Sequence, residues 1–239
     1  MLKIERLTKQ YGEKKAVDNL SLHINKGEIY GFIGHNGAGK TTTIKSCCGI
    51  LDFNEGEIYI DGISVKDNPI ECKKMISYIP DNPDLYEFMT GIQYLNFVAD
   101  IFGVSTSKRE ELIYKYSDLF EITGNLSQLI SEYSHGMKQK LANISALIHK
   151  PKLLILDEPF VGLDPKASLV LKNSMKKLCE EGTAIFFSTH VLDVAEKLCN
   201  KVAIIRSGEL IAAGKTDELT DGDSLESVFM EVMGDAKAD

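Results

Sequence analysis

Hydrophobic and polar residues alternate over much of the first sixty positions, as expected for β-strands with one buried face. Every second residue from Leu20 to Ile24 is apolar, and Leu2–Leu7 follows a less regular form of the same pattern. A third alternating segment, Ile58–Ile60, ends at the turn signal Asp61-Gly62. These segments predict short strands separated by turns, which form an antiparallel β subdomain. The compact apolar segment Glu28–Ile33 predicts another strand.

The pattern changes to a helical period between about residues 90 and 150. Apolar residues recur three and four positions apart in Ile92–Phe102, Leu112–Phe120 and Leu141–Ile148. Ser134 is a suitable N-cap for the last of these helices, and Pro151 ends it. This block predicts a helical insert.

Strand patterns resume after the insert at Lys152–Leu156, Thr183–Ser188 and Val202–Arg206, with helix-compatible segments between them. Strands that alternate with helices predict a mostly parallel, doubly wound sheet. The predicted fold is therefore α/β, with a mostly parallel sheet, an N-terminal antiparallel β subdomain and a helical insert. We expect residues 1–239 to form a single domain.

Composition and charge narrow the functional classes. The 239 residues are 44% hydrophobic and 26% charged, which is typical of a globular protein. The formal net charge of −8 argues against binding nucleic acid by phosphate neutralisation. Eight acidic residues and one lysine lie in 216–239, so most of the net charge falls there. We interpret this acidic tail as a solvated, partly frayed terminus.

The sequence also indicates where the protein works. No apolar run approaches the roughly 18–20 residues of a membrane span, and residues 1–10 lack the apolar core of a secretion signal. The five cysteines show no metal-ligand spacing and are expected to be reduced thiols. Adjacent Cys47 and Cys48 are expected to pack in a helical segment. We therefore expect a cytoplasmic protein.

A glycine-rich loop follows the strand at Glu28–Ile33. Its sequence, Gly34-His-Asn-Gly-Ala-Gly-Lys-Thr41, matches the phosphate-loop pattern G-x-x-x-x-G-K-[ST] and precedes helix-compatible residues. Glycines let backbone N–H groups wrap around an anion at a helix start. Lys40 should reach the β- and γ-phosphates, and the Thr41 hydroxyl should hold Mg²⁺. The predicted ATP contacts are Gly34, His35, Asn36, Gly37, Ala38, Gly39, Lys40, Thr41 and Thr42, the last at the α-phosphate.

Two adjacent carboxylates end the strand at Lys152–Leu156. Asp157 and Glu158 follow a run of buried-strand type, at the sheet edge where α/β proteins bind ligands. Asp157 is expected to contact Mg²⁺, and Glu158 is positioned to polarise an attacking water. Loop and carboxylates together predict ATP binding and hydrolysis.

The stretch Tyr133-Ser-His-Gly-Met-Lys-Gln-Lys140 lies between the insert and these carboxylates. It resembles the signature, usually LSGGQ, of the ATP-binding subunits of ABC transporters, and the resemblance to that family covers nearly the whole chain. It implies that Ser134 and Gly136 contact the γ-phosphate of ATP held by an opposite subunit.

Further positions acquire roles from the same resemblance. Tyr11 falls where the family stacks an aromatic ring on adenine, although packing of a turn is a serious alternative. Gly162-Leu-Asp164 resembles the D-loop, whose aspartate lies at the subunit junction, and His190 matches the switch histidine that contacts the γ-phosphate. The His23, His35 and His149 side chains match no family role.

Several positions depart from the family pattern. Asp81 stands where the family usually has glutamine, so it could coordinate Mg²⁺ directly, through water or not at all. His135 and Met137 replace signature residues, and Val161 replaces the usual D-loop serine. Asp81 and the tail Ser224–Met230 are similar to the export-type branch of the family, which implies export.

The resemblance implies a head-to-tail pair of ATP-binding subunits, a homodimer or a pair with a close paralogue, on a separate transmembrane permease. The loop around Asp81 and the helical insert would dock on that permease, at the inner face of the cell membrane. Two alternatives remain open: a soluble ABC-type ATPase of translation or DNA maintenance, and a regulatory or immunity subunit. Neither a second such domain nor a long coiled coil is found in these 239 residues, and Glu158 and His190 argue against a regulatory subunit.

Overall fold

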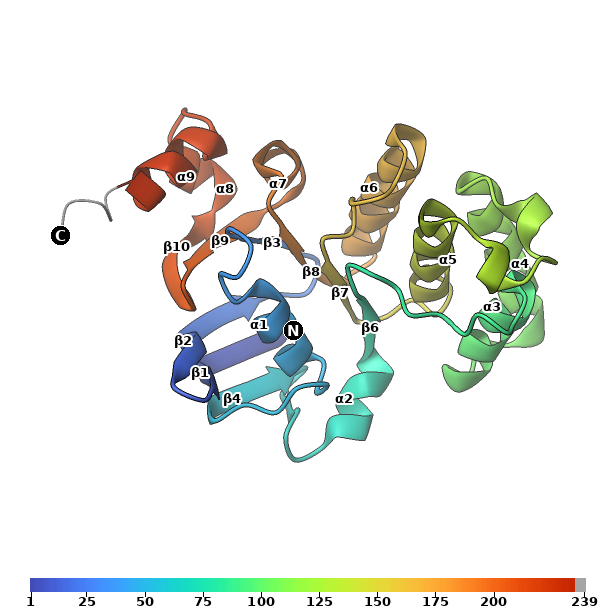
Figure 1. Ribbon diagram of the computed structural model, residues 1–239, viewed down its shortest axis with the longest axis horizontal. Coiled ribbons are helices and arrows are strands. Elements are labelled where there is room, and N and C mark those ends of the chain that lie inside the picture. Colours follow the sequence, from blue (N-terminus) through green and yellow to red (C-terminus); the bar gives the residue numbers. More distant parts are fainter. Residues whose placement is uncertain (235–239) are drawn as a thin grey trace.

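The computed structural model describes residues 1–234, and a six-stranded sheet runs through their centre (Figure 1). Its strand order is β10-β9-β3-β8-β7-β6. All neighbouring pairs are parallel except β10 with β9. The strands are β3 (Ile29–Ile33), β6 (Ile76–Ile79), β7 (Leu153–Asp157), β8 (Ala184–Thr189), β9 (Lys201–Arg206) and β10 (Glu209–Lys215). The predicted mostly parallel sheet is confirmed, and β6 and β10 are additions to it.

Both faces of this sheet are covered, which explains why its strands are apolar at nearly every position. In β8, Ile185 and Phe187 face the core on the helical side, whereas Ala184 and Phe186 face the core on the other side. All four side chains are fully buried. Such strands have no polar face, so they read as continuous apolar runs.

A second, antiparallel sheet has the order β2-β1-β4-β5. It comprises β1 (Leu2–Tyr11), β2 (Lys14–Ile24), β4 (Glu55–Ile60) and β5 (Ile63–Ser64). The first two strands are longer than the short strands expected. The register of β1 shifts between Ile4 and Leu7, and Arg6 there has a φ of 48°. This irregularity lets Ile4 and Leu7, three positions apart, both point inward, which accounts for the imperfect alternation.

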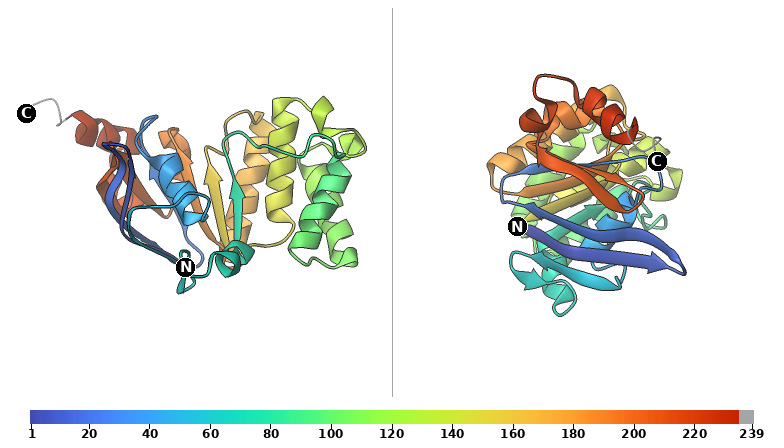
Figure 2. Two further views of the ribbon diagram at one scale, coloured as in Figure 1. Left: turned by 60° about the horizontal axis from the view of Figure 1, so that its bottom comes forward. Right: turned by 90° about the vertical axis from the view of Figure 1, so that its left-hand side faces the viewer.

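Helices pack against both faces of the central sheet. They are α1 (Lys40–Cys47), α2 (Pro69–Met75), α3 (Gly91–Ile101), α4 (Thr106–Leu119), α5 (His135–Leu147), α6 (Pro165–Glu180), α7 (Leu192–Leu198), α8 (Thr216–Thr220) and α9 (Leu225–Gly234). Helices α3–α5 are the predicted insert, and they lie at the opposite end of the molecule from the antiparallel sheet (Figures 1 and 2). Ser134 caps α5 as predicted, because its Oγ accepts the Met137 N–H at 3.3 Å. Within residues 1–234, no helix combines the length and apolar composition of a membrane span.

The interpretation of the acidic tail as a frayed terminus is wrong for most of its length. Residues 216–234 form α8 and α9, whereas 235–239 lie outside the described residues. Leu225 is fully buried and Phe229 is 7% exposed, with Val228 packed beside the same core. These apolar residues are spaced three and four positions apart, so they form one helical face that buries itself despite the surrounding charge.

His149 stacks on Phe102 at the end of the insert, with ring centroids 3.7 Å apart. Burial lowers the pKa of His149 from 6.5 to about 4. Between these pH values the unfolded chain therefore binds a proton that the folded chain does not bind, so the free energy of unfolding should fall as the pH drops. At pH 5 the lowered pKa of His149 should reduce the free energy of unfolding by about 2 kcal/mol.

Urea unfolding at pH 7 and pH 5 measures this loss. His149→Phe keeps an aromatic stack on Phe102 and should remove about 2 kcal/mol of the pH dependence. His23→Gln, at an exposed position, should leave it unchanged. The same pH dependence in wild type and His149→Phe would contradict the assignment.

Candidate active site

The phosphate loop lies so close to β9 and β2 that two of its residues must be glycine. A Cβ atom at Gly34 would lie 2.5 Å from the carbonyl oxygen of Ile205. A Cβ at Gly39 would lie 2.4 Å from the carbonyl oxygen of Ala16, and Gly39 has a φ of 110°. Gly39 is also the N-cap of α1. The loop therefore ends at the start of a helix, where backbone N–H groups without intrahelical partners can bind an anion. This local geometry is the one the motif predicts.

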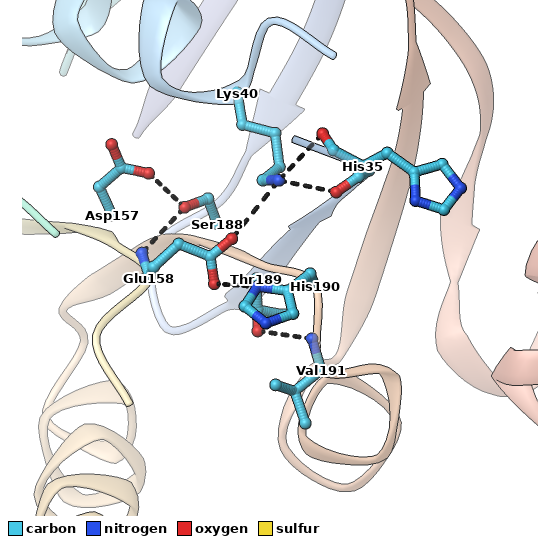
Figure 3. Close-up of polar contacts among 9 residues, drawn as sticks. His35, Lys40, Asp157, Glu158, Ser188, Thr189, His190 and Val191 are labelled. Carbon is cyan, nitrogen blue, oxygen red and sulfur yellow. Dashed lines mark hydrogen bonds and ion pairs between the residues drawn. The ribbon is translucent and has the colours of Figure 1, made fainter. Parts of the chain in front are cut away.

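Lys40 is held inside this loop with only 7% of its side chain exposed. Its Nζ donates to the carbonyl oxygens of Gly34 at 2.7 Å and His35 at 3.3 Å. Oε1 of Glu158 lies 3.4 Å from Nζ, and Oε2 of Glu158 lies 3.0 Å from Nδ1 of His190 (Figure 3). The structure thus brings together the three predicted catalytic residues, with the glutamate between lysine and histidine.

Ser188 connects the two carboxylate residues, and sequence reasoning missed it. Its hydroxyl donates to Oδ1 of Asp157 at 2.5 Å and accepts the N–H of Glu158 at 3.0 Å (Figure 3). The Glu158 backbone has a φ of 48°, a conformation that non-glycine residues adopt at a cost. Ser188 is fully buried and pairs in register with Asp157. It therefore orients the carboxylate of Asp157 and fixes the backbone of Glu158 from the neighbouring strand.

A cavity of about 430 Å³ opens over the phosphate loop. Its lining includes most of the predicted ATP contacts, together with Lys14 and Ala16, which the sequence did not suggest. The lining residues are Tyr11, Lys14, Ala16, His35, Asn36, Gly37, Gly39, Lys40, Thr41, Thr42, Asp81 and Glu158. The Tyr11 ring is 51% exposed, so one face of a flat base could cover it.

The predicted Mg²⁺ ligands offer suitable oxygen atoms. Oδ2 of Asp157 is buried and accepts no hydrogen bond from the described residues. Exposed Thr41 and Asp81 line the cavity. Residues 1–234 contain no cluster of three or more His, Cys, Asp or Glu side chains that could enclose a metal. A site with few protein ligands fits Mg²⁺, which keeps several waters and binds substrate phosphates.

Side chains behind the carboxylates remain neutral. Burial raises the pKa of the Tyr78 phenol and of the Cys48 thiol, and nearby Asp157 adds to both shifts. Cys47 and Cys48 are buried, as predicted. The thiols and the phenol therefore supply packing and no nucleophile.

Five predicted ATP contacts do not line this cavity. Gly34 and Ala38 belong to the phosphate loop itself, whereas the other three lie elsewhere. Within the described chain, Ser134, Gly136 and Asp164 do not line the cavity over the phosphate loop. They gather where α5 meets the D-loop: Asp164 caps α6 and pairs with Lys140 at 2.7 Å, which lowers the pKa of Asp164. The unusual His135 packs against Gly162, where a Cβ atom would lie 2.8 Å from the imidazole.

Comparison with known proteins identifies the family. Residues 17–161 match the family model described as ABC transporter. The chain is 39% identical to the ATP-binding protein YxlF of Bacillus subtilis, an uncharacterized ABC transporter component, over 92% of this chain and 72% of YxlF. It is 36% identical to the bacitracin transport ATP-binding protein BcrA of Enterococcus faecalis, over 92% of this chain and 70% of BcrA.

Solved structures agree with these relatives. An ATP-binding subunit of an ABC transporter superimposes with a TM-score of 0.94 at 33% identity, over 98% of this chain and 99% of that one. The ATP-binding cassette MJ0796, solved as a dimer in a post-hydrolysis state with ADP and Pi, gives 0.82 at 25% identity, over 90% and 99% of the two chains. The chain therefore belongs to the ABC transporter family, as an ATP-binding and ATP-hydrolysing subunit.

Proposed function

We propose that Lys40, Glu158 and His190 carry out the hydrolytic step. Lys40 clamps the β- and γ-phosphates, Glu158 polarises the attacking water, and His190 contacts the γ-phosphate. The observation that carries this proposal is the position of Glu158 between the ammonium and the imidazole. Bound phosphates would replace Glu158 as the anion beside Lys40, which would leave the carboxylate available for water.

Thr41 and Asp157 would hold Mg²⁺, and Asp81 lies close enough to the cavity to contribute through water. The ion would neutralise charge on the phosphate oxygens. The unpartnered Oδ2 of Asp157 supports this role, because a buried carboxylate oxygen needs a donor or a cation. Ser188 keeps the other oxygen of Asp157 occupied, so Oδ2 is the atom that would face the ion.

The complete site would require a second ATP-binding subunit. Ser134, Gly136 and Asp164 lie outside the cavity of their own chain, which supports their use on ATP held by a partner. The dimeric form of MJ0796 is consistent with such an arrangement. Each ATP would then join two surfaces that separate after hydrolysis, as in a ligand-dependent two-state switch.

Residues 1–239 would act as one domain, attached to a transmembrane permease at the inner face of the membrane. An exposed aromatic cluster next to the Asp81 loop is the best docking surface. Tyr86 packs against Phe88, Tyr94 and Phe97, and Phe88 is 75% exposed. Exposed aromatic clusters of this kind are typical of protein interfaces.

Export is the direction that we favour. BcrA is named for bacitracin transport, and another relative, from Bacillus subtilis, is named for linearmycin resistance, as expected for proteins that remove antibiotics. Asp81 and the Ser224–Met230 tail support the same branch. Cells that carry only the Glu158→Gln form should become more sensitive to an exported compound. A defect restricted to nutrient uptake would contradict export.

The role of Glu158 is tested by Glu158→Gln. The amide cannot accept the proton of water, so turnover should fall about 100-fold or more, while ATP still binds and holds a dimer together. Phosphate release and size-exclusion chromatography with ATP measure the two effects. Glu209→Gln, at an exposed position, serves as the control. Wild-type hydrolysis by Glu158→Gln would exclude the assignment.

The role of Lys40 is tested by Lys40→Ala. Loss of the ammonium removes a charge-assisted contact to the phosphates, so ATP affinity should fall by about tenfold or more. Calorimetric titration measures the affinity. Lys45→Ala, one turn further along α1, is the control and should bind ATP as wild type does. Unchanged ATP affinity in Lys40→Ala would refute the phosphate-loop assignment.

The docking surface is tested by substituting glutamate for each of two similarly exposed apolar residues. Phe88→Glu should abolish co-purification of an integral membrane protein and the rise in ATPase activity when the two are combined. Ile70→Glu, on α2 and 70% exposed against 75% for Phe88, should leave both unchanged. If neither variant changes the association, the aromatic cluster is not the docking surface. If wild type associates with no membrane protein, a soluble ATPase is favoured.

A further inference from the structure

Besides β9 and β2, the phosphate loop has a further neighbour, which is the C-terminal helix α9. The imidazole of His35 points away from Lys40, Glu158 and His190 (Figure 3). It meets the ring of Phe229 edge to face, with centroids 5.1 Å apart and planes at 69°. Phe229 is 7% exposed, whereas His35 is an exposed residue. A side chain from the far end of the chain therefore contacts the loop that binds ATP.

Helix α9 is fixed near both of its ends. At its start, the N–H of Leu225 donates to Oε2 of Glu196 on α7 at 2.7 Å. Near its end, the carbonyl of Val232 accepts from Nη1 of Arg206 at 2.9 Å. Arg206 directly follows Ile205, the residue against which Gly34 is packed. The helix, β9 and the phosphate loop therefore form one continuous set of contacts.

The part of the loop that Phe229 touches is exposed, and the carbonyl of His35 also accepts the N–H of Ala38 at 3.1 Å. Residues 35–37 are exposed, and a cavity of about 170 Å³ separates them from Arg206 and Met233. The carbonyl of His35 accepts from Nζ of Lys40 at 3.3 Å, so a shift of His35 would move an oxygen that holds the lysine. The contact of Phe229 with His35 therefore helps to fix the position of the Lys40 ammonium.

We propose that Phe229 is a positioning residue for ATP binding: through the ring of His35, α9 holds the phosphate loop in its ATP-binding conformation. The coupling free energy between two sites is reciprocal. If α9 favours ATP binding, bound ATP should therefore stabilise the packing of α9 by the same amount. This inference goes beyond the proposed roles of Lys40, Glu158 and the signature residues, and it can fail while those roles stand.

The first test removes the ring. Phe229→Ala should weaken the binding of a fluorescent ATP analogue about 2- to 10-fold, the size expected for loss of one aromatic pair. Hydrolysis at saturating ATP should change less, since the ring touches no reacting group. Met230→Ala, at the next position of α9 and 65% exposed, should bind as wild type does. Equal affinities in all three proteins would overturn the proposal.

The second test uses His35, because a change at an exposed residue should not unfold the protein. His35→Ala should reproduce the loss seen in Phe229→Ala, and the double variant should be no weaker than the weaker single variant. His35→Phe keeps an aromatic contact with Phe229 and should recover part of the affinity that His35→Ala loses. Additive losses, or a His35→Phe variant as weak as His35→Ala, would assign the imidazole a different role and overturn the proposal.

A third measurement separates positioning from mere stability. Backbone hydrogen exchange in 225–234 should slow when ATP is added to wild type, and this protection should be lost in His35→Ala although its melting temperature is unchanged. If the exchange rate of α9 in wild type is the same with and without ATP, the proposal is also overturned.

Discussion

The structure depends most on how it holds one buried positive charge. The Lys40 ammonium is removed from water, so it needs oxygen atoms in place of its hydration shell. Two backbone carbonyls of the phosphate loop and the carboxylate of Glu158 provide them. The carbonyls are in range because Gly34 and Gly39 let the loop approach β9 and the β1–β2 segment without a side chain between them. The phosphate loop, the strand edge beside it and the carboxylate of Glu158 together hold the ammonium where a phosphate group can bind it.

Those parts of the site that lie within one short segment could be predicted from the sequence. The phosphate loop, Asp157 and Glu158 each carry their chemistry in consecutive residues, and the spacing of apolar residues predicted the insert. Ser188 could not be found that way, because its role depends on the register between β7 and β8, which places it opposite Asp157. Parallel strands that are apolar on both faces carry no pattern that reveals their register. Lys14 and Ala16 were missed for a similar reason, because the fold of the antiparallel sheet brings them to the cavity.

The tail shows where reasoning from charge fails. Its acidic residues outnumber its basic ones, which favours a solvated segment, yet the burial of a few apolar residues decides its structure. Leu225 and Phe229 are one helical turn apart and reach the same core. The charges stay on the outer face, where water screens them at little cost. Spacing within α9 was therefore more informative than the net charge of the segment.

The arrangement fits the proposal that one chain holds only half of each site. Contacts of Asp164 and His135 connect α5 with the D-loop, so the signature residues and the D-loop lie along one continuous edge. That edge does not line the cavity over its own phosphate loop, within the residues described. A ligand shifts a conformational equilibrium only through contacts that differ between the two states, and in the proposed dimer the contact of ATP with a second edge of this kind would be such a contact. If α9 holds the phosphate loop in shape, as we propose, each subunit would carry a binding half that is ready before the second half arrives.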